Sequence, residues 1–480
     1  MNCPPQSLHP AEPLHRIVRD MSTETIALGS RREMFVDGYL LDRLEGMRQQ
    51  LHQPERRGYV LEVHPPNENA CTACYNVVDD TDGGLFLYYR GFYPIGERAA
   101  DHNERQTCNV ARGYDGVHFH RPLLDLFPQQ EDGRPGVAPN TVWRGYEGHN
   151  FCVFIDRNPK ADPAQRFKAV GGGSKNRLFG FSSPDGIRWD RLQLAPLDIE
   201  GAFDSVNVPL WDDHASCYRL FSRYFVEIDG IRVRAIQSCA SDDFIHWSKP
   251  VPHQYDAGVP MEQFYTNATQ SCPGAEHILL SFPMRFLPDR TLDTEGMDYP
   301  QEGLSDAVFM SSRDGVHWDR TFRHAWLRPG REQRNWTHRN QTPAVGIIDT
   351  GDGEWSMYIS EHYGWNDNRL RRVTVRPWGF ASLHAEVHGE AVTKPFNFEG
   401  SQLLVNYATS AAGSIRIELQ DGDGMPVPEF GLEDSQVIFG DQIESAAAWT
   451  RGTDVSSLQG RALRMRVVVE DADLFSFRFA

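Results

Sequence analysis

The sequence predicts an all-β protein made of a five-bladed β-propeller followed by a C-terminal β-sandwich. Three observations lead to this fold class. A turn of similar sequence recurs at intervals of 58 to 71 residues. Short runs of alternating apolar and polar residues, bounded by Asp, Gly and Pro, lie between the copies. After His384 the recurring turn stops, although strand-like alternation continues to the end of the chain.

The recurring turn reads "YDGVHF", "PDGIRW", "DDFIHW" and "RDGVHW". Aligned on Gly116, Gly186, Phe244 and Gly315, the copies lie 70, 58 and 71 residues apart, and a degenerate fifth copy follows at Gly379. An Asp-Gly step supplies the positive φ that a tight turn needs, and a repeat of this length indicates a supersecondary unit. Four strands per unit, repeated radially, predict a propeller. The aromatic residues that end the turns are expected to pack between neighbouring sheets: Phe119, Trp189, Trp247 and Trp318.

The spacing divides the chain into three parts. Residues 1–31 form a polar, partly disordered lead, residues 32–385 the catalytic propeller, and residues 386–480 an accessory β-sandwich with its own core. The alternating segment "REMFVDGYLLDRLEG", Arg32 to Gly46, is the expected strand that closes the ring by joining the last blade.

Composition narrows the possible partners. The net charge of −18 disfavours nucleic acid, which needs basic patches. No apolar stretch approaches the roughly 20 residues of a membrane span, and no secretion signal is readable. A cytoplasmic protein with reduced cysteines is therefore expected, and a homo-oligomer stays open. Cys71 and Cys74 form a CxxC without a second pair, so they are read as small buried residues.

In a propeller the first strand of each blade lines the axis. Each of the five units opens with an asparagine near the head of an apolar strand: Asn69, Asn150, Asn207, Asn267 and Asn340. These side chains either face a ligand in the funnel or satisfy backbone groups at turns.

Charged and aromatic residues accompany these asparagines. Carboxylates and amides bind hydroxyl groups, and arginine supplies donors, so the set suits a polyhydroxylated ligand. The charged members are Glu68, Arg90, Glu147, His149, Asp204, Arg223, Glu262, Arg285, His338, Arg339, Glu361 and His362. The aromatic members are Tyr265, Trp336, Tyr363 and Trp365.

The five-unit period, the Asp-Gly-aromatic turns and the trailing sandwich resemble the five-bladed propeller glycoside hydrolases of families 32, 43 and 68. The signature strings "WMNDPNG", "RDP" and "EC" of that clan are absent. The "FVD", "YTNA" and "SEHY" segments more closely resemble uncharacterised bacterial propeller proteins. The resemblance implies a glycosidase that acts on a terminal sugar, such as a furanoside, in a funnel pocket.

The clan's three inner carboxylates imply roles here. Glu68 would be base or nucleophile, Asp204 would orient the sugar and raise its partner's pKa, and Glu262 would be the protonated acid. The clan places its carboxylates on the first three blades, whereas this set omits the second, so Glu147 and Glu361 are substitutes.

Three rival functions remain. Arg90, Arg223 and Arg285 would suit a sialidase-like hydrolase of an acidic sugar. A metal-dependent lyase or lactonase would draw ligands from the axial histidines His149, His338 and His362, although no short-range ligand spacing supports it. A non-catalytic sugar-binding propeller would show no pair of carboxylates at catalytic separation. No cofactor or metal is expected, with a structural calcium in the funnel left open.

Overall fold

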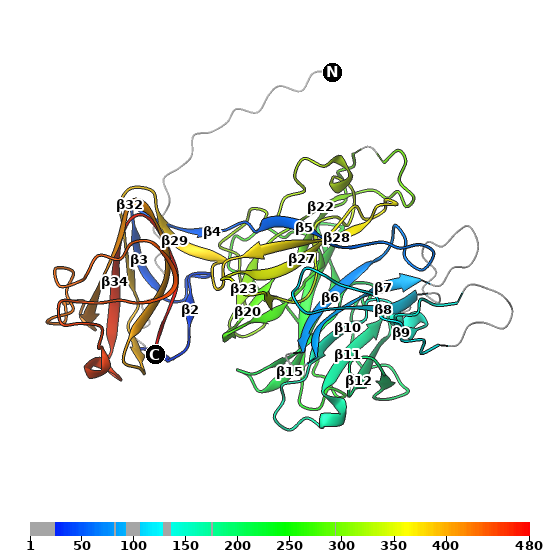
Figure 1. The fold of residues 1–480 in the computed structure, drawn as a ribbon, viewed down its shortest axis with the longest axis horizontal. Coiled ribbons are helices and arrows are strands. Elements are labelled where there is room, and N and C mark those ends of the chain that lie inside the picture. Colours follow the sequence, from blue (N-terminus) through cyan, green and yellow to red (C-terminus); the bar gives the residue numbers. More distant parts are fainter. Residues whose placement is uncertain (1–24, 81–82, 93–105, 128–135, 174–175, 293) are drawn as a thin grey trace, which may run out of the picture.

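The computed structural model describes residues 25–80, 83–92, 106–127, 136–173, 176–292 and 294–480 (Figure 1). The predicted lead of residues 1–31 lies mostly outside this range. The described residues form β-strands and four short 3-10 turns, η2 (Tyr146–Gly148), η3 (Pro163–Gln165), η4 (Gln333–Asn335) and η5 (Ser456–Leu458). The predicted all-β class is therefore confirmed. None of the described segments is a helix long and apolar enough to cross a membrane.

Five antiparallel units follow one another along the chain. The first contains β6 (Ala73–Asp80), β7 (Gly84–Phe92), β8 (Gln106–Gly113) and β9 (Thr141–Arg144). The second contains β10 (Cys152–Ile155), β11 (Phe167–Gly172), β12 (Leu178–Ser183) and β13 (Asp190–Arg191). The third contains β14 (Val208–Asp212), β15 (Cys217–Ile228), β16 (Ile231–Ser241) and β17 (Val251–Pro252).

The last two units are less regular. The fourth is split into two short sheets, β18 (Phe264–Thr266), β21 (Met284–Leu287) and β22 (Leu304–Ala307), and β19 (Gln270–Cys272), β20 (Ala275–Ser281), β23 (Met310–Ser312) and β24 (Trp318–Asp319). The fifth contains β25 (Thr342–Pro343), β26 (Ile348–Asp349), β27 (Trp355–Glu361) and β28 (Arg369–Val375). Its outer strand is β5 (Glu55–Glu62), from the start of the chain.

The pairing of β5 with β28 corrects one prediction. Leu61 pairs with Leu370, whereas the segment Arg32–Gly46, predicted as the closing strand, supplies β2 and β3 to a different sheet. As the outermost strand of its sheet, β5 is largely exposed and its sequence "ERRGYVLE" is mostly polar. The sequence of β5 therefore lacks the alternation of apolar and polar residues that predicts a half-buried strand.

Contacts between units run around the chain and return to their start. The first strands β6, β10, β14 and β19 contact one another in that order, β22 contacts β25, and β26 contacts β6. A parallel bridge between Asn76 and Val345 joins the first unit to the fifth. The heads of distant strands are thereby gathered in one region.

In three of the five units the recurring turn bonds to a neighbouring unit, as the second copy illustrates. The Asp185 carboxylate accepts hydrogen bonds from the backbone N–H groups of Ile187 and Arg188, at 2.9 and 2.8 Å. Gly186 adopts a φ of +73°. Its carbonyl oxygen accepts a 2.8 Å hydrogen bond from the hydroxyl of Tyr88, on β7 of the preceding unit. The turn therefore both reverses the chain and bonds to its neighbour.

Other copies make equivalent bonds. The Gly116 carbonyl accepts from the Tyr358 hydroxyl at 2.8 Å, and the Gly315 carbonyl accepts from Ser238 Oγ at 2.9 Å. In the degenerate fifth copy, the Trp378 indole donates to the Pro273 carbonyl at 2.8 Å. The predicted packing of turn aromatics between units is confirmed for Phe119 on Tyr358, Trp189 on Tyr88 and Trp318 on Phe221.

The C-terminal part is one ten-stranded sheet with β34 (Leu463–Phe479) at its centre. Its other strands are β1 (Ile26–Gly29), β2 (Glu33–Met34), β3 (Leu41–Glu45), β4 (Arg48–Leu51), β29 (Ala381–Ala385), β30 (Gly389–Thr393), β31 (Phe396–Phe398), β32 (Leu403–Asp421) and β33 (Asp441–Ala446). A separate apolar cluster that includes Trp449 and Phe477 forms its core. This part therefore includes residues 26–51 as well as the predicted C-terminal strands.

Buried charges join the N-terminal strands to the fourth unit. Glu33 on β2 is fully buried, and its carboxylate accepts from His277 Nε2 at 3.0 Å and lies 2.9 Å from Arg313 Nη2. Burial raises the pKa of Glu33, but the hydrogen bonds and charges of His277 and Arg313 outweigh it and lower the pKa to about 2.

We expect Gly186→Ala to lower the free energy of unfolding by about 2 kcal/mol. A Cβ there lies 2.7 Å from the Tyr88 hydroxyl, and alanine disfavours the positive φ. Gly258→Ala is the control, because Gly258 has a φ of +80° with no atom within 4 Å of its Cβ position. Urea unfolding should show a smaller loss for Gly258→Ala; equal losses would contradict the predicted clash with Tyr88.

Glu33 should make stability depend on pH. The folded pKa of Glu33, about 2, lies below the ordinary value of 4.5. Glu33 therefore makes its full contribution to the free energy of unfolding above pH 4.5, and this contribution is lost as the pH falls towards 2. The shift corresponds to roughly 3 kcal/mol. Glu33→Gln should flatten the fall in unfolding free energy between these pH values, whereas Glu386→Gln, at an exposed pair, should not. An unchanged slope in Glu33→Gln would contradict this assignment.

Candidate functional site

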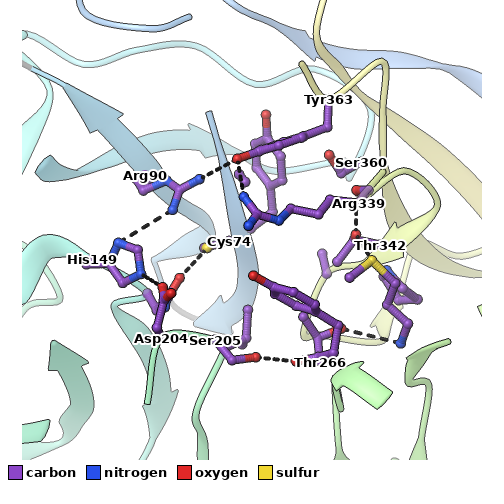
Figure 2. Close-up of a pocket in the computed structure, with 18 residues that line it drawn as sticks. Cys74, Arg90, His149, Asp204, Ser205, Thr266, Arg339, Thr342, Ser360 and Tyr363 are labelled. Carbon is purple, nitrogen blue, oxygen red and sulfur yellow. Dashed lines mark hydrogen bonds and ion pairs between the residues drawn. The ribbon is translucent and has the colours of Figure 1, made fainter. Parts of the chain in front are cut away.

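A pocket lies where the heads of the first strands meet, and all five units contribute to it (Figure 2). We call it the central pocket; it encloses about 60 Å³. Its lining residues are Ala73, Cys74, Tyr75, Arg90, His149, Asn150, Asp204, Ser205, Val206, Tyr265, Thr266, Met284, Arg339, Thr342, Pro343, Ala344, Ser360 and Tyr363. This volume is enough for several waters or for one compact ligand group.

Three lining residues adopt left-handed backbone conformations that side chains disfavour. Cys74, Asn150 and Arg339 have φ values of +58°, +52° and +57°. They come from the first, second and fifth units, and each stands at or near the head of a first strand. Backbone strain of this kind costs about 1–3 kcal/mol per residue and gathers at functional sites. The conformations therefore favour the central pocket as a site of function.

A histidine–aspartate pair lies at one side of the pocket (Figure 2). His149 Nε2 lies 2.7 Å from Asp204 Oδ1. His149 is buried and Gln106 hydrogen-bonds its Nδ1, whereas 61% of the Asp204 side chain is exposed. The hydrogen bond from His149 holds the pKa of Asp204 well below its usual range, with smaller contributions from Arg223 and Arg339. Asp204 therefore presents an ionised carboxylate to the pocket.

Two arginines reach the same tyrosine hydroxyl from different units. Arg90 on β7 donates to the Cys71 carbonyl at 2.6 Å and to the Tyr363 hydroxyl at 3.4 Å. Arg339 Nη1 donates to the same hydroxyl at 3.1 Å. Figure 2 shows Tyr363 between the two guanidinium groups. Burial raises the pKa of Tyr363 well above its usual range, so its hydroxyl stays protonated.

Tyr265 also lines the pocket, against two arginines. Arg339 lies 5.1 Å and Arg223 4.9 Å from the centre of its ring. The Cys74 thiol donates to Asn150 Oδ1 at 2.6 Å, and burial raises the pKa of Cys74, so it is a neutral thiol.

The structure brings five of the predicted site residues to this pocket: Arg90, His149, Asn150, Asp204 and Arg339. Two predicted aromatic residues, Tyr265 and Tyr363, line it as well, whereas Trp336 and Trp365 do not. Arg223 lies beside it, against Tyr265.

Glu68, predicted as base or nucleophile, lies outside the pocket lining in a saturated network. Its carboxylate accepts from the Tyr89 hydroxyl at 2.6 Å, from Arg121 at 2.8 and 2.6 Å, and from the His64 N–H at 2.8 Å. All its acceptor positions are used to hold the segment before β6. These contacts favour a structural role.

Glu262, predicted as the protonated acid, also lies outside the lining. It accepts hydrogen bonds from Arg285, at 2.7 Å, and from Arg320. Burial raises its pKa, but the two arginines outweigh it and lower the pKa below the ordinary value. An ionised carboxylate is the opposite of what the predicted acid requires. Arg285 also pairs with Asp306, so it is not available to a ligand.

The remaining charged predictions are held away from the pocket lining. Glu147 pairs with Arg191, Glu361 lies against Arg371 at 2.9 Å, and His362 lies between Glu332 and Asp367. His338 is buried against Tyr299 and Tyr363, and burial lowers its pKa to about 3. No group of three or more metal-ligating side chains occurs among the described residues.

All five asparagines hydrogen-bond to backbone groups, which was the alternative interpretation of their pattern; Asn150 donates to the Phe203 carbonyl at 3.5 Å and also lines the pocket. Asn207 donates to the Phe203 and Ser205 carbonyls at 2.9 Å, and Asn340 Oδ1 accepts from the Tyr363 N–H at 2.8 Å. Asn69 and Asn267 make similar bonds.

Several lining residues were not predicted: Cys74, Ser205, Thr266, Thr342 and Ser360. All are small and polar or weakly polar, and residues of these types are common in turns and strands. Except for Cys74, each lies one or two residues from a predicted member, as Ser205 follows Asp204, and this position was the one signal that could have found them.

No protein-family model and no curated protein matches this chain. It is similar to a solved structure described as a glycoside hydrolase, with 12% identity over 68% of this chain and 93% of that one and a TM-score of 0.46. A β-1,2-mannobiose phosphorylase from Listeria innocua has 11% identity over 66% and 92%, with a TM-score of 0.42. A Dyadobacter fermentans protein of unknown function has 11% identity over 88% and 99%, with a TM-score of 0.39. At these values, function has to be argued from the chain itself.

We expect Glu68→Gln to lower the free energy of unfolding by about 2 kcal/mol, because Arg121 would keep a partly buried charge without its partner. Glu45→Gln, at an exposed pair, should change it by less than about 0.5 kcal/mol. Urea titration checks both. A stable Glu68→Gln variant that has lost sugar turnover would restore the catalytic role first predicted for this residue.

Proposed function

We propose that this protein is a carbohydrate-active enzyme whose five units are the blades of a β-propeller. The central pocket, at the axis, would bind the terminal sugar of an oligosaccharide or glycoside. One observation carries this proposal: an exposed, ionised carboxylate, a buried histidine bonded to it and a protonated tyrosine all line one pocket. Carboxylate and guanidinium groups bind sugar hydroxyls, and the Tyr265 ring offers an apolar face beside them.

Cleavage of a glycosidic bond is the proposed reaction, with Asp204 as its acting carboxylate. Asp204 would serve as base or nucleophile, because it is ionised and faces the pocket. His149 orients it through the 2.7 Å contact. The Tyr363 hydroxyl accepts from Arg90 and Arg339, so its own proton is free to be donated to a substrate oxygen. These roles replace the pair of carboxylates first expected.

Sugar binding without turnover is the second candidate. It is favoured by the fact that Asp204 is the one carboxylate among the described residues that line the pocket, whereas glycosidases generally use two. The C-terminal sheet would serve either function as an accessory β-sandwich. Cytoplasmic location and independence of cofactors stay predictions.

Asp204→Asn tests the proposal. In a screen of nitrophenyl glycosides and of plant or algal oligosaccharides, we expect turnover by the wild type and a fall in kcat of roughly 10²–10⁴ in the variant. Asp243→Asn is the matched control, because Asp243 makes the same 2.7 Å contact with a histidine, His246, in an exposed turn. It should keep wild-type kcat.

Calorimetry with the same sugars separates the two candidates. Binding by both wild type and Asp204→Asn, without product in either, would favour the non-catalytic function. Full activity in Asp204→Asn would contradict the role proposed for this carboxylate.

A further inference from the structure

We infer that the sugar bound in the central pocket carries a carboxylate, as a uronic acid does, and that Arg90 and Arg339 bind this group. The inference rests on the proposed function, because it takes the pocket as the sugar site. Its basis is that the arginines at the pocket lack the carboxylate partners that several other buried or partly buried arginines have.

Several buried or partly buried arginines elsewhere are neutralised by carboxylates. Arg121 pairs with Glu68 at 2.6 Å, Arg313 with Asp37 at 2.8 Å, and Arg320 with Glu262. Such pairing is expected, because an arginine is seldom buried without a counter-charge.

The arginines of the central pocket lack this neutralisation. Arg90, Arg223 and Arg339 make no ion pair with any carboxylate among the described residues, although Arg90 and Arg223 are at least nine-tenths buried. Asp204 is the one carboxylate in the lining, and His149 already bonds to it. Two guanidinium groups in the lining, with Arg223 beside the pocket, therefore face one carboxylate, and a bound anion would restore the balance.

The two lining arginines converge on one position. Both donate to the Tyr363 hydroxyl, at 3.4 Å from Arg90 and 3.1 Å from Arg339. An oxygen beside that hydroxyl lies within reach of both guanidinium groups (Figure 2). The Arg339 guanidinium donates one hydrogen bond among the described residues, so its remaining N–H groups can form the planar fork that matches the two oxygens of a carboxylate. Arg90 also donates to the Cys71 carbonyl and contacts His149 Nδ1, so it adds charge and at most one further N–H group. The geometry thus provides a carboxylate site rather than a diffuse positive field.

The rest of the pocket suits the remainder of a sugar. The Asp204 carboxylate accepts hydrogen bonds from hydroxyl groups, and Tyr265 lines the pocket beside Arg339 and Arg223. This arrangement also revises the acidic-sugar alternative drawn from the sequence. Arg285, one of its three arginines, is held by Glu262 and Asp306, and Arg339 takes its place.

The test compares sugars that differ only at C6. Calorimetry on the full chain would use D-galacturonate, its methyl ester, D-galactose and D-galactose 6-sulfate. D-glucuronate and D-glucose would form a second pair. We expect each uronate to bind at least 10-fold more tightly than its neutral partner, and the methyl ester to bind like the neutral sugar.

The variants Arg339→Gln and Arg90→Gln should each lose about 10- to 100-fold in uronate affinity and should lose little affinity for neutral sugars. Arg43→Gln, at an exposed pair, is the control and should bind like the wild type.

The unfolding temperature is a second measurement, and it also shows whether each variant is folded. Because Arg339 makes no ion pair with a carboxylate among the described residues, Arg339→Gln should unfold at a temperature equal to or above that of the wild type, while galacturonate should stabilise only the wild type. Equal affinity for acidic and neutral sugars, or tighter binding of the sulfate, would overturn the inference while leaving the proposed function intact. If the wild type neither binds nor turns over any of these sugars, acidic or neutral, the proposed function fails as well.

Discussion

One recurring turn fixes three of the five units of this protein, the first, second and fourth, against a neighbouring unit. The turn's carboxylate holds its own backbone, its left-handed residue directs a carbonyl outwards, and a hydroxyl of the previous unit binds that carbonyl. Because the bond recurs at Gly116, Gly186 and Gly315, the angle between successive units is set repeatedly by the same local geometry. The first strands can therefore meet at their heads, and the central pocket exists only because they do.

The parts of the fold that depend on local chemistry could be predicted from the sequence. Asp185 and Gly186 meet requirements that lie within a few residues, so the turns, their spacing and the all-β class were readable. The outer strand β5 was missed because an exposed strand needs no apolar alternation. The segment Arg32–Gly46 shows that alternation, but nothing in it indicates which of two sheets it joins.

The site residues illustrate a different limit. Glu68 and Asp204 both precede a first strand by a few residues, and the sequence treats them alike. They differ because Arg121, 53 positions after Glu68, saturates its carboxylate, while His149, 55 positions before Asp204, leaves most of that side chain exposed. Pairing between residues so far apart in the sequence is decided by how the units pack. The sequence therefore identifies both carboxylates as candidate catalytic residues but does not indicate which of them faces the pocket.

The route of the chain bears on how the molecule assembles. Strands β2, β3 and β5 come early, yet their partners β34, β30 and β28 lie more than 300 residues later. Such remote pairing carries a large loop-closure cost and slows folding. On a ribosome, residues 26–62 have to wait for the last part of the chain while the middle units form. Until then these strands present unpaired edges, which are prone to association with other chains. Newly made molecules should therefore need chaperone protection at their N-terminal end more than anywhere else.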